Sequence, residues 1–452
     1  MRSVISTLRH GSATERLRLG FELLLAVVLF AALAYYAHGI RKWPTDVDVY
    51  RLGADTFLKG HSIYTQLPVS SVGGALPYTY PPFSAVLFTP LAIIPPHIGY
   101  PLLTGLTCLA LIPLVLAYRK GSPELAKYLS KPWMVMAGAC VLVVAHPVAN
   151  TIFWGQINVL LMTLVALDCL WPNPKWPRGA LIGIAAAIKL TPAGFCLLFL
   201  LRRDFRSVVT SFISFVVCSA IAFVLMPSDS IMYWTDRVFH ATGMNIGPIH
   251  ANESWQATFE KLGVTGSTLT LVSGVGIIAI VAMTWLGTKR ALDDGNLAMA
   301  LGVNATGVLL VSPISWSHHW VLALPTAAIV MVQGYQKHKF WLLASGWFGV
   351  LILWLAPHYW VPLEYEHWSF AQKIVGSSYQ IIAMAFLIVM TVRWFTGRKR
   401  RGTVDDLDFE LATETTAVLP ALAGAEGAVD PKRAARPNGA IRTPAGAVED
   451  AG

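Results

Sequence analysis

Residues 207–226 read SVVTSFISFVVCSAIAFVLM, a run of apolar and small polar residues without a charge. Three more runs of similar length and character lie at 19–38, 269–287 and 375–395. An apolar helix of about 20 residues crosses the hydrocarbon layer of a bilayer. A chain in lipid must satisfy its own backbone hydrogen bonds, and continuous Leu, Ala and Val runs favour helices over alternating strands. The sequence therefore predicts an all-α membrane protein.

The composition agrees with a chain whose solvent is the bilayer. Hydrophobic residues make up 55% of the 452 residues and charged residues 13%, a balance that excludes an ordinary soluble domain. All five cysteines lie in apolar stretches, so they are expected to pack as small hydrophobes and not to form disulfides or a metal site. The first apolar run is too long for a signal peptide and is expected to stay as a span.

The formal net charge of +9 is concentrated in short clusters of Lys and Arg between the apolar runs. Such clusters stay on the cytoplasmic side of a membrane, so the charge indicates topology and gives no reason to expect a nucleic-acid partner. A topology with about twelve spans places these clusters and both termini on the cytoplasmic side of the plasma membrane. The spans are expected near 19–38, 97–118, 133–149, 156–171, 178–189, 191–202, 207–226, 269–288, 296–313, 318–334, 340–357 and 375–395.

This topology divides the chain into three parts. Residues 1–18 are a cytoplasmic segment and residues 19–395 are the transmembrane catalytic domain. Residues 396–452 are a cytoplasmic tail, basic at first and then disordered because it lacks an apolar stripe. Two long outer loops, 39–81 and 227–268, are expected to carry short amphipathic helices.

Two segments fit the span pattern poorly. Residues 178–202 could form one span, but the arginines at 202–206 would then lie outside, so we expect two short helices that meet at Lys189-Leu190-Thr191-Pro192. Broken helices of this kind line polar cavities. Residues 82–95 are too few for a normal span and are expected to form an interfacial or re-entrant helix.

Most polar clusters fall on the outer side of this topology, although Lys and Arg alone define it. The clusters are TDVDVYR at 45–51, YTYPP at 78–82, WGQIN at 154–158, Lys189, NESW at 252–255 and SPISWSHHW at 312–320. A purely structural scaffold does not explain why they converge on one face. We therefore expect chemistry at the outer membrane face.

Asp46 and Asp48 follow the first span, where a carboxylate near low dielectric keeps its charge only with a partner or a function. Arg51 is a candidate partner. A solvated loop with an internal salt bridge is the structural alternative, and the neighbouring clusters favour a catalytic role.

Lys189 and the pair His318-His319 are further ionisable residues of these clusters. An ammonium between apolar helices needs an anionic partner, either an outer carboxylate or a bound phosphate. The histidines are expected to begin a span, where neutral imidazole can cap a helix, accept a proton or bind a phosphate. A metal site is not expected, because adjacent histidines on a helix point about 100° apart and no second pair has zinc-site spacing.

The remaining polar residues have ordinary explanations beside the functional one. Gln156 and Asn158 can bond one helix to another. Tyr80, Trp154 and Trp316 can be interfacial aromatics or stacking surfaces for a sugar ring.

Five of these segments together resemble glycosyltransferase family 87. They are DVDVY at 46–50, TYPPF at 79–83, WGQIN at 154–158, KLTP at 189–192 and SPISWSHH at 312–319. The family consists of multi-spanning GT-C enzymes and includes actinobacterial α-1,2-mannosyltransferases that use polyprenyl-phosphate-mannose. The resemblance implies a GT-C-type fold and an inverting enzyme. Its acceptor would be a glycolipid or lipoglycan such as a phosphatidylinositol mannoside, lipomannan or lipoarabinomannan.

The resemblance also implies roles for individual residues. An Asp-x-x-Val-Tyr pattern selects Asp46 as the general base, and Lys189 with His318 or His319 would offset charge on the donor phosphate. His318 is expected to be catalytic with Asp46. The expected substrate-binding residues are Asp48, Tyr50, Arg51, Tyr80, Trp154, Gln156, Asn158, Lys189, Asn252, Glu253, Trp316 and His319. No cofactor and no metal are expected. The sequence has no Gly-rich phosphate loop, so a nucleotide-sugar donor is not expected either.

Two other functions are compatible with parts of this pattern. A polyprenyl-phosphate-arabinose donor would be served by much the same architecture. A lipid or solute transporter could have a polar outer vestibule, although transporters usually place ionisable groups near the midplane and show paired repeats.

Overall fold

The structure, a computed structural model, describes residues 44–239 and 251–396 apart from 66 and 72, with a few more residues between 12 and 27. The described residues form helices, and an isolated β-bridge between Asn252 and Trp316 is the extended pairing found among them. The all-α prediction is therefore confirmed for this part. The expected first span is almost entirely outside the described residues, as is the tail beyond Thr396. The compact unit that contains the described helices ends at Phe395.

Five helices of the described part are long and apolar enough to cross a membrane. They are α6 (Pro96–Gly121), α13 (Phe205–Leu225), α16 (Gly266–Asp293), the segment Phe340–Tyr359 that contains α19 (Phe340–Leu355), and the helix Ser378–Thr396. Only 17% of the apolar window of α13 is buried inside the protein, and the same share holds for α16. Many of their apolar side chains are therefore exposed, among them Phe212, Val224 and Leu271, as contact with lipid requires.

The span expected at 133–149 consists of two helices with a bend between them. α8 (Pro132–Val144) and α9 (His146–Trp154) meet at Ala145 with a bend of 66°. Pro147 explains the bend, because it has no N–H for the carbonyl of Val143 and its ring would clash with that carbonyl. The bend lets α9 pack against the 3-10 turn η5 (Ser317–His319).

The break expected at residues 189–192 is present. α11 (Ala180–Ile188) ends before Lys189, whose backbone is extended, and the chain continues as the 3-10 turn η1 (Thr191–Phe195) and α12 (Cys196–Leu201). Pro192 cannot donate to the carbonyl of Ile188, as a continuous helix would require.

Residues 82–95 also contain no span. They form α4 (Pro82–Leu87) and α5 (Thr89–Ile93), two helices that are too short to cross a bilayer.

The histidine pair does not begin a span, contrary to expectation. His318 and His319 lie in η5, and the next helix, α18 (Ala323–Gln336), starts at Ala323. The carbonyl of His318 instead accepts hydrogen bonds from Thr151 and Asn158, at 3.1 and 3.3 Å. It is therefore held by side chains and not by a helical ladder.

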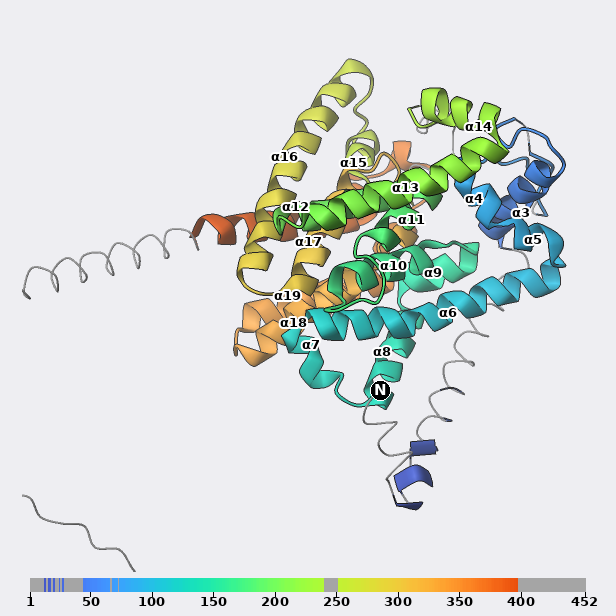
Figure 1. Ribbon diagram of the computed structural model, residues 1–452. Helices are drawn as coiled ribbons and strands as arrows, with labels where there is room; N and C mark the ends of the chain where they lie inside the picture. The colour runs from blue at the N-terminus through green and yellow to red at the C-terminus, as the bar shows by residue number, and fades with distance from the viewer. Residues whose placement is uncertain are drawn as a thin grey trace, which may run out of the picture. The chain divides into compact units, whose positions relative to one another are not determined.

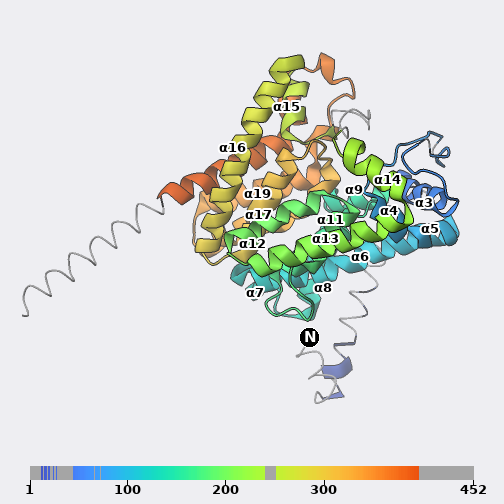
Figure 2. The ribbon, with the colours of Figure 1, turned by 45° about the horizontal axis from the view of Figure 1, so that its top comes forward.

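The remaining helices are shorter. They are α3 (Thr45–Leu58), α7 (Pro123–Tyr128), α10 (Asn158–Leu170), α14 (Pro227–Met232), the π turn η2 (Tyr233–Arg237), α15 (Trp255–Lys261), α17 (Leu297–Val311), the 3-10 turns η6 (Pro357–Tyr359) and η7 (Tyr365–His367), and α20 (Phe370–Gly376). Short helices are thus present in both loops where they are expected. Figures 1 and 2 show α3, α4, α5 and α14 near the N-terminal end of α6 and α7 at its other end.

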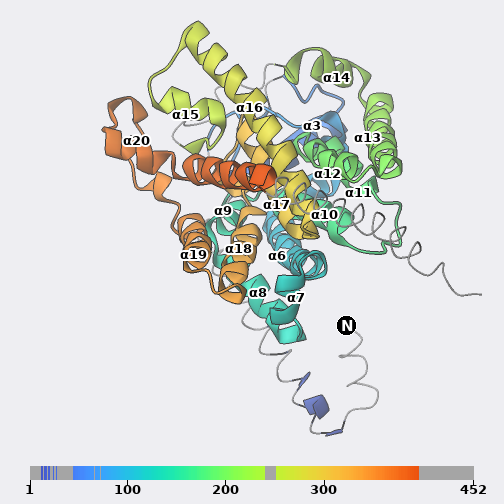
Figure 3. The ribbon, with the colours of Figure 1, turned by 90° about the vertical axis from the view of Figure 1, so that its left-hand side faces the viewer.

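Polar contacts join the basic ends of several helices. Glu124 of α7 accepts hydrogen bonds from Asn296, before α17, and from Gln333, near the end of α18. Arg393 of the last helix, which crosses α16 in Figure 3, pairs with Asp294 at the end of α16 at 2.9 Å. η5 follows the opposite end of α17. The ends of α16, α18 and the last helix, which carry Arg290, Lys337 and Arg393, therefore gather beside α7 and the start of α17, and the histidine pair follows the other end of α17.

Candidate active site

Asp46 lies in the first turn of α3 and is partly exposed, whereas its neighbours in that turn are buried. The side-chain amide of Gln156 donates a hydrogen bond to Asp46 Oδ2 at 2.7 Å. Gln156 Oε1 accepts from the hydroxyls of Tyr50 and Tyr80, at 2.9 and 3.1 Å. Three segments that are far apart in the sequence therefore meet at Asp46.

Gly155 makes this meeting possible. It ends α9 with φ +68° and ψ 35°, a left-handed conformation that glycine adopts without steric cost. A Cβ at this position would lie 2.7 Å from Val47 Cγ1 and 2.8 Å from Pro44 Cβ. The end of α9 can therefore pack directly on the start of α3, which brings Gln156 to Asp46.

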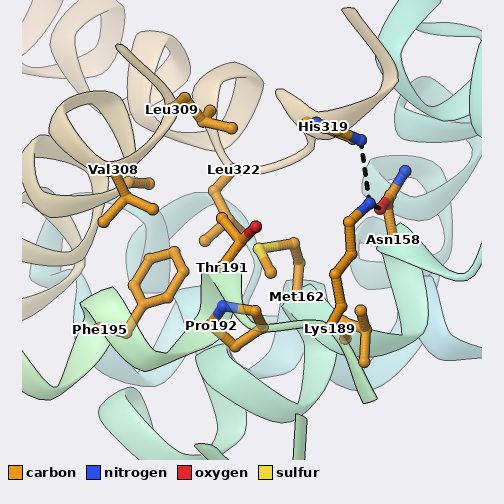
Figure 4. A pocket seen from close by; sticks show the side chains of 12 residues that line it. Asn158, Met162, Lys189, Thr191, Pro192, Phe195, Val308, Leu309, His319 and Leu322 are labelled. Carbon is orange, nitrogen blue, oxygen red and sulfur yellow. Dashed lines mark hydrogen bonds between the residues drawn. The ribbon is translucent and has the colours of Figure 1, made fainter. Parts of the chain in front are cut away.

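Lys189, in the break after α11, is the cation of the site. Its ammonium donates to Asn158 Oδ1 at 2.9 Å and lies 3.0 Å from His319 Nε2 (Figure 4). Because an ammonium can only donate, this contact requires an unprotonated Nε2. The ammonium also lies 5.5 Å from the centre of the Tyr80 ring. These direct partners are neutral.

The two histidines of η5 have different surroundings. His319 is partly exposed and lines a pocket together with Lys189 and Asn158. His318 is 5% exposed, and neither of its ring nitrogens has a hydrogen-bond partner among the described residues. The two rings are nearly perpendicular, with 88° between their planes. This geometry favours His319 over His318 as the histidine that meets a substrate.

The pocket beside Lys189 and His319 has mostly apolar walls. Besides Asn158, its other lining residues are Leu161, Met162, Thr191, Pro192, Phe195, Ala305, Val308, Leu309 and Leu322. Figure 4 shows Lys189, Asn158 and His319 grouped on one side of it and Phe195 and Val308 on the other. The pocket therefore has hydrogen-bonding groups on one side and hydrocarbon on the other.

Asp48 lies in a closed environment. It is 1% exposed and accepts hydrogen bonds from Ser71 N, the Tyr100 hydroxyl and Arg51 Nε, at 2.7, 2.5 and 3.1 Å. Burial by itself would raise the pKa of Asp48, but the hydrogen bonds from Ser71 and Tyr100 and the Arg51 charge lower it on balance. Arg51 is therefore the partner of Asp48, and the pair ties α3 to α6.

Asn252, Glu253 and Trp316 form a separate group. Asn252 bridges to Trp316, and its Oδ1 accepts from Ser315 N at 2.9 Å. Glu253 is fully buried, and its Oε1 lies 3.6 Å from Lys261 Nζ and from His358 Nδ1. Burial raises the pKa of Glu253 to about 7, although the charge on Lys261 opposes the shift. Glu253 therefore does not face a substrate in this structure.

Trp154 is the last residue of α9 and is partly exposed. Its ring lies 5.2 Å from the ring of Phe153, in an edge-to-face arrangement. Its position beside Gly155 and Gln156 leaves a sugar-stacking role open to test.

Three residues with important contacts are absent from the sequence predictions: Tyr100, Lys261 and His358. Lys261 follows the NESW cluster in a short helix, and His358 follows the apolar helix α19. An ionisable residue beside an apolar run is the signal that singles out Lys189, and the same signal could have found His358. Lys261 lies in the mixed segment WQATFEK and carries no such signal. Tyr100 carries no such signal, because tyrosines at helix starts are common in membrane proteins.

Fold and site together define a class: an all-α membrane protein in which a carboxylate, a lysine and a histidine converge beside an apolar pocket. Comparison with known proteins gives the family. The profile of glycosyltransferase family 87 matches residues 78–313. The chain belongs to glycosyltransferase family 87, as the resemblance of its motifs predicts, and it is a membrane glycosyltransferase.

Relatives of known name cover most of the chain. A polyprenol-phosphate-mannose-dependent alpha-(1-2)-phosphatidylinositol mannoside mannosyltransferase of Mycobacterium tuberculosis is 32% identical over 379 residues, which are 81% of this chain and 88% of that protein. Its namesake in Mycolicibacterium smegmatis is 33% identical over 364 residues, 76% of this chain and 83% of that protein. A phosphatidylinositol pentamannoside mannosyltransferase of M. tuberculosis is 30% identical over 320 residues, 68% of this chain and 70% of that protein. No solved structure matches the chain.

Proposed function

We propose that this chain transfers mannose from polyprenyl-phosphate-mannose to a hydroxyl of a phosphatidylinositol mannoside and forms an α-1,2 linkage. The names of the relatives support the donor, the linkage and the acceptor class. One structural observation carries the proposal: Lys189 and His319 lie 3.0 Å apart at the polar end of an apolar pocket, and Tyr80, which faces the Lys189 ammonium, bonds Gln156, the partner of partly exposed Asp46. A lipid-linked sugar phosphate offers the complementary groups, an anionic head on an apolar chain.

Asp46 is proposed to be the general base. It takes the proton of the acceptor hydroxyl as the hydroxyl oxygen attacks C1 of mannose, and the bond between C1 and the phosphate oxygen breaks. The bonding electrons leave with the polyprenyl phosphate, so a β-linked donor gives an α-mannoside. A phosphate leaving group needs little protonation, and one well-placed carboxylate is sufficient.

Lys189 and His319 are proposed to bind the donor phosphate. Negative charge grows on the leaving phosphate oxygen, and a preorganised cation in a low-dielectric site stabilises that charge. The Lys189 ammonium has three N–H donors. Asn158 and His319 are its two hydrogen-bond partners among the described residues, which leaves one N–H for a phosphate oxygen.

The apolar walls of the pocket are proposed to hold the first isoprene units of the donor. Met162, Phe195 and Val308 offer hydrocarbon and aromatic surface next to the phosphate position. A nucleotide diphosphate, with its polar base and ribose, would leave this surface unused and bury polar groups without partners.

The grouping of the basic helix ends supports a proposal for the membrane topology. We propose that the end with Glu124 and Arg393 is cytoplasmic and that Asp46, Lys189 and His319 work at the outer face of the plasma membrane, because Lys and Arg favour the inside. The proposed topology has about twelve crossings. It divides the chain into a cytoplasmic segment at 1–18, a catalytic domain at 19–395 and a cytoplasmic tail at 396–452. The chain is proposed to need no cofactor.

A transfer assay in lipid nanodiscs tests the proposal. The purified chain receives polyprenyl-phosphate-mannose labelled in the sugar, together with a phosphatidylinositol mannoside, and the product is digested with an α-1,2-specific mannosidase. We expect a labelled glycolipid that loses its label on digestion. Transfer from GDP-mannose, preferential transfer from polyprenyl-phosphate-arabinose, or no transfer would each contradict the proposal.

A further inference from the structure

Gln156 is 6% exposed and holds the partly exposed carboxylate of Asp46 at 2.7 Å. We propose that Gln156 is a positioning residue, which fixes the direction of the Asp46 carboxylate and does not bind a substrate. The proposal rests on the role of Asp46 as general base and goes beyond it. It replaces the substrate-binding role that the motif WGQIN suggests for Gln156.

The orientation of the Gln156 amide follows from its neighbours. An ionised carboxylate only accepts hydrogen bonds, so the NH₂ group of Gln156 must face Asp46. The amide oxygen must then face Tyr50 and Tyr80, whose hydroxyls can both donate. A flipped amide would put its oxygen against the carboxylate, where both groups can only accept, and would lose the hydrogen bond to Asp46.

The residues that support Gln156 are more buried than the carboxylate they serve. Tyr50 is 0% exposed and its ring stacks on Phe88 with 4.4 Å between centroids. Tyr80 is 8% exposed and forms an edge-to-face pair with Tyr50. Because packing holds both rings, the two hydroxyls have fixed positions. A reactive group on a rigid support of this kind is preorganised for its reaction.

Tyr80 connects the two halves of the site. Its hydroxyl bonds Gln156, and its ring faces the Lys189 ammonium at 5.5 Å. Burial and then the charge of Asp46 raise the pKa of Tyr80, so it remains a hydroxyl that can donate. Tyr80 therefore contacts both Gln156, which orients the Asp46 carboxylate, and the Lys189 ammonium.

The replacement Gln156→Met tests positioning against binding. Methionine has a similar length and volume but cannot donate to Asp46. We expect kcat to fall about 10²-fold, since a misaligned catalytic group costs about that much, while KM for donor and acceptor stays within about twofold of wild type. A raised KM with unchanged kcat would show that Gln156 binds substrate and would overturn the proposal.

The replacement Gln156→Glu gives a second readout. Two carboxyl groups in contact share one proton, which raises the second apparent pKa of the pair. The ionisable groups facing the pair are Lys189, Tyr50 and Tyr80. We expect the acid limb of the pH profile of kcat to move upward by about one pH unit or more. An unshifted profile would mean that position 156 does not control Asp46.

A matched pair of tyrosine variants covers the case in which the Gln156 variants fail to fold. Tyr50→Phe removes one donor to Gln156 at a site that substrate cannot reach, and we expect kcat to fall several-fold without a change in KM. The control is Tyr78→Phe, because Tyr78 is equally buried but bonds Ser84 and not Gln156. Equal effects of the two variants would overturn the proposal.

Failure of the inference differs from failure of the proposed function. If wild type transfers mannose and Asp46→Asn does not, but Gln156→Met keeps full activity, the base is correct and the positioning role is wrong. If Asp46→Asn keeps wild-type activity, the proposed base itself is wrong, whatever the Gln156 variants do.

Discussion

Two groups in this protein each contain a carboxylate, a lysine and a histidine, but one group is buried and the other is partly exposed. The closed cluster consists of Glu253, Lys261 and His358, whose side chains are 0% exposed. The open site consists of Asp46, Lys189 and His319, all partly exposed.

The partners of the two groups differ as well. In the closed cluster the carboxylate lies between two nitrogen groups of the protein, and Lys261 Nζ also donates to the carbonyl of Gly376 at 2.7 Å. In the open site Gln156 and Asn158 hold Asp46 and Lys189 with neutral amides. In the closed cluster the protein itself supplies the opposite charge and leaves none for a substrate, whereas charges that neutral groups hold in place remain able to act on a substrate.

The closed cluster still serves the open site through the backbone. Glu253 N donates to Ser315 O at 2.6 Å, and Asn252 Oδ1 accepts from Ser315 N. Ser315 lies two residues before the start of η5, which carries His319. The cluster therefore supports the segment that presents this histidine, and the comparison predicts large effects on catalysis at the open site and effects on stability at the closed cluster.

The largest expected effect is that of Asp46→Asn. Asparagine keeps the shape and can still accept from Gln156, but it cannot take the acceptor proton. We expect kcat for mannose transfer to fall about 10³-fold, within the range typical of a lost general base, with an unfolding temperature close to wild type. A variant that keeps more than half of the wild-type kcat would remove Asp46 from the mechanism.

Lys189→Met comes next. It removes the cation while keeping a long apolar side chain in the pocket. We expect kcat to fall about 10²-fold, as for loss of one transition-state-stabilising group, and KM for the lipid-phosphate donor to rise. Steady-state kinetics in nanodiscs measures both. Unchanged donor KM and kcat would mean that the phosphate binds elsewhere.

Asp48→Asn tests the buried neighbour of the base. Loss of charged hydrogen bonds to Tyr100 and Arg51 should cost about 1.5–3 kcal/mol of unfolding free energy, with kcat reduced far less than in Asp46→Asn. The folded state lowers the pKa of Asp48, so its stabilisation is present above the unfolded pKa and is lost as pH falls. Wild type should therefore lose more stability on acidification than the variant, and equal losses would contradict this.

The smallest effect on transfer is expected for Glu253→Gln. Burial raises the pKa of Glu253 from 4.5 to about 7, so its contribution to stability is full below about 4.5 and is lost as pH rises through about 7. As pH rises from about 4.5 to about 7, the unfolding temperature of wild type should therefore fall more steeply than that of the variant. The transfer rates of the two proteins should stay similar. A large loss of transfer without a loss of stability would place Glu253 in the active site.

The sequence predicts those features that depend on local patterns. Apolar runs identify α6, α13 and α16, and Pro192 explains the break at Lys189. Pro147 carries the same kind of signal for the bend after α8, but the continuous hydropathy on both sides of it predicts a span without showing the bend. Motif resemblance identifies the family and selects Asp46 over Asp48.

Contacts between distant segments could not be predicted in the same way. Nothing near Arg51 in the sequence shows that Tyr100 and Ser71 complete the closed environment of Asp48. The partners of Glu253 come from α15 and η6, and the carbonyl of His318 is held by side chains of α9 and α10. Packing in three dimensions decides which of two neighbouring aspartates, or of two neighbouring histidines, is exposed.

The most direct test of the open site is a map of where the donor lipid binds. A polyprenyl phosphate with a photoreactive diazirine on its first isoprene units is irradiated with the protein in nanodiscs, and the labelled peptides are identified by mass spectrometry. We expect labels on the pocket walls, at Met162, Phe195 or Val308, and a clear loss of labelling in Lys189→Met. Labels on α15 or α20, or labelling that Lys189→Met leaves unchanged, would contradict the assignment of the donor site.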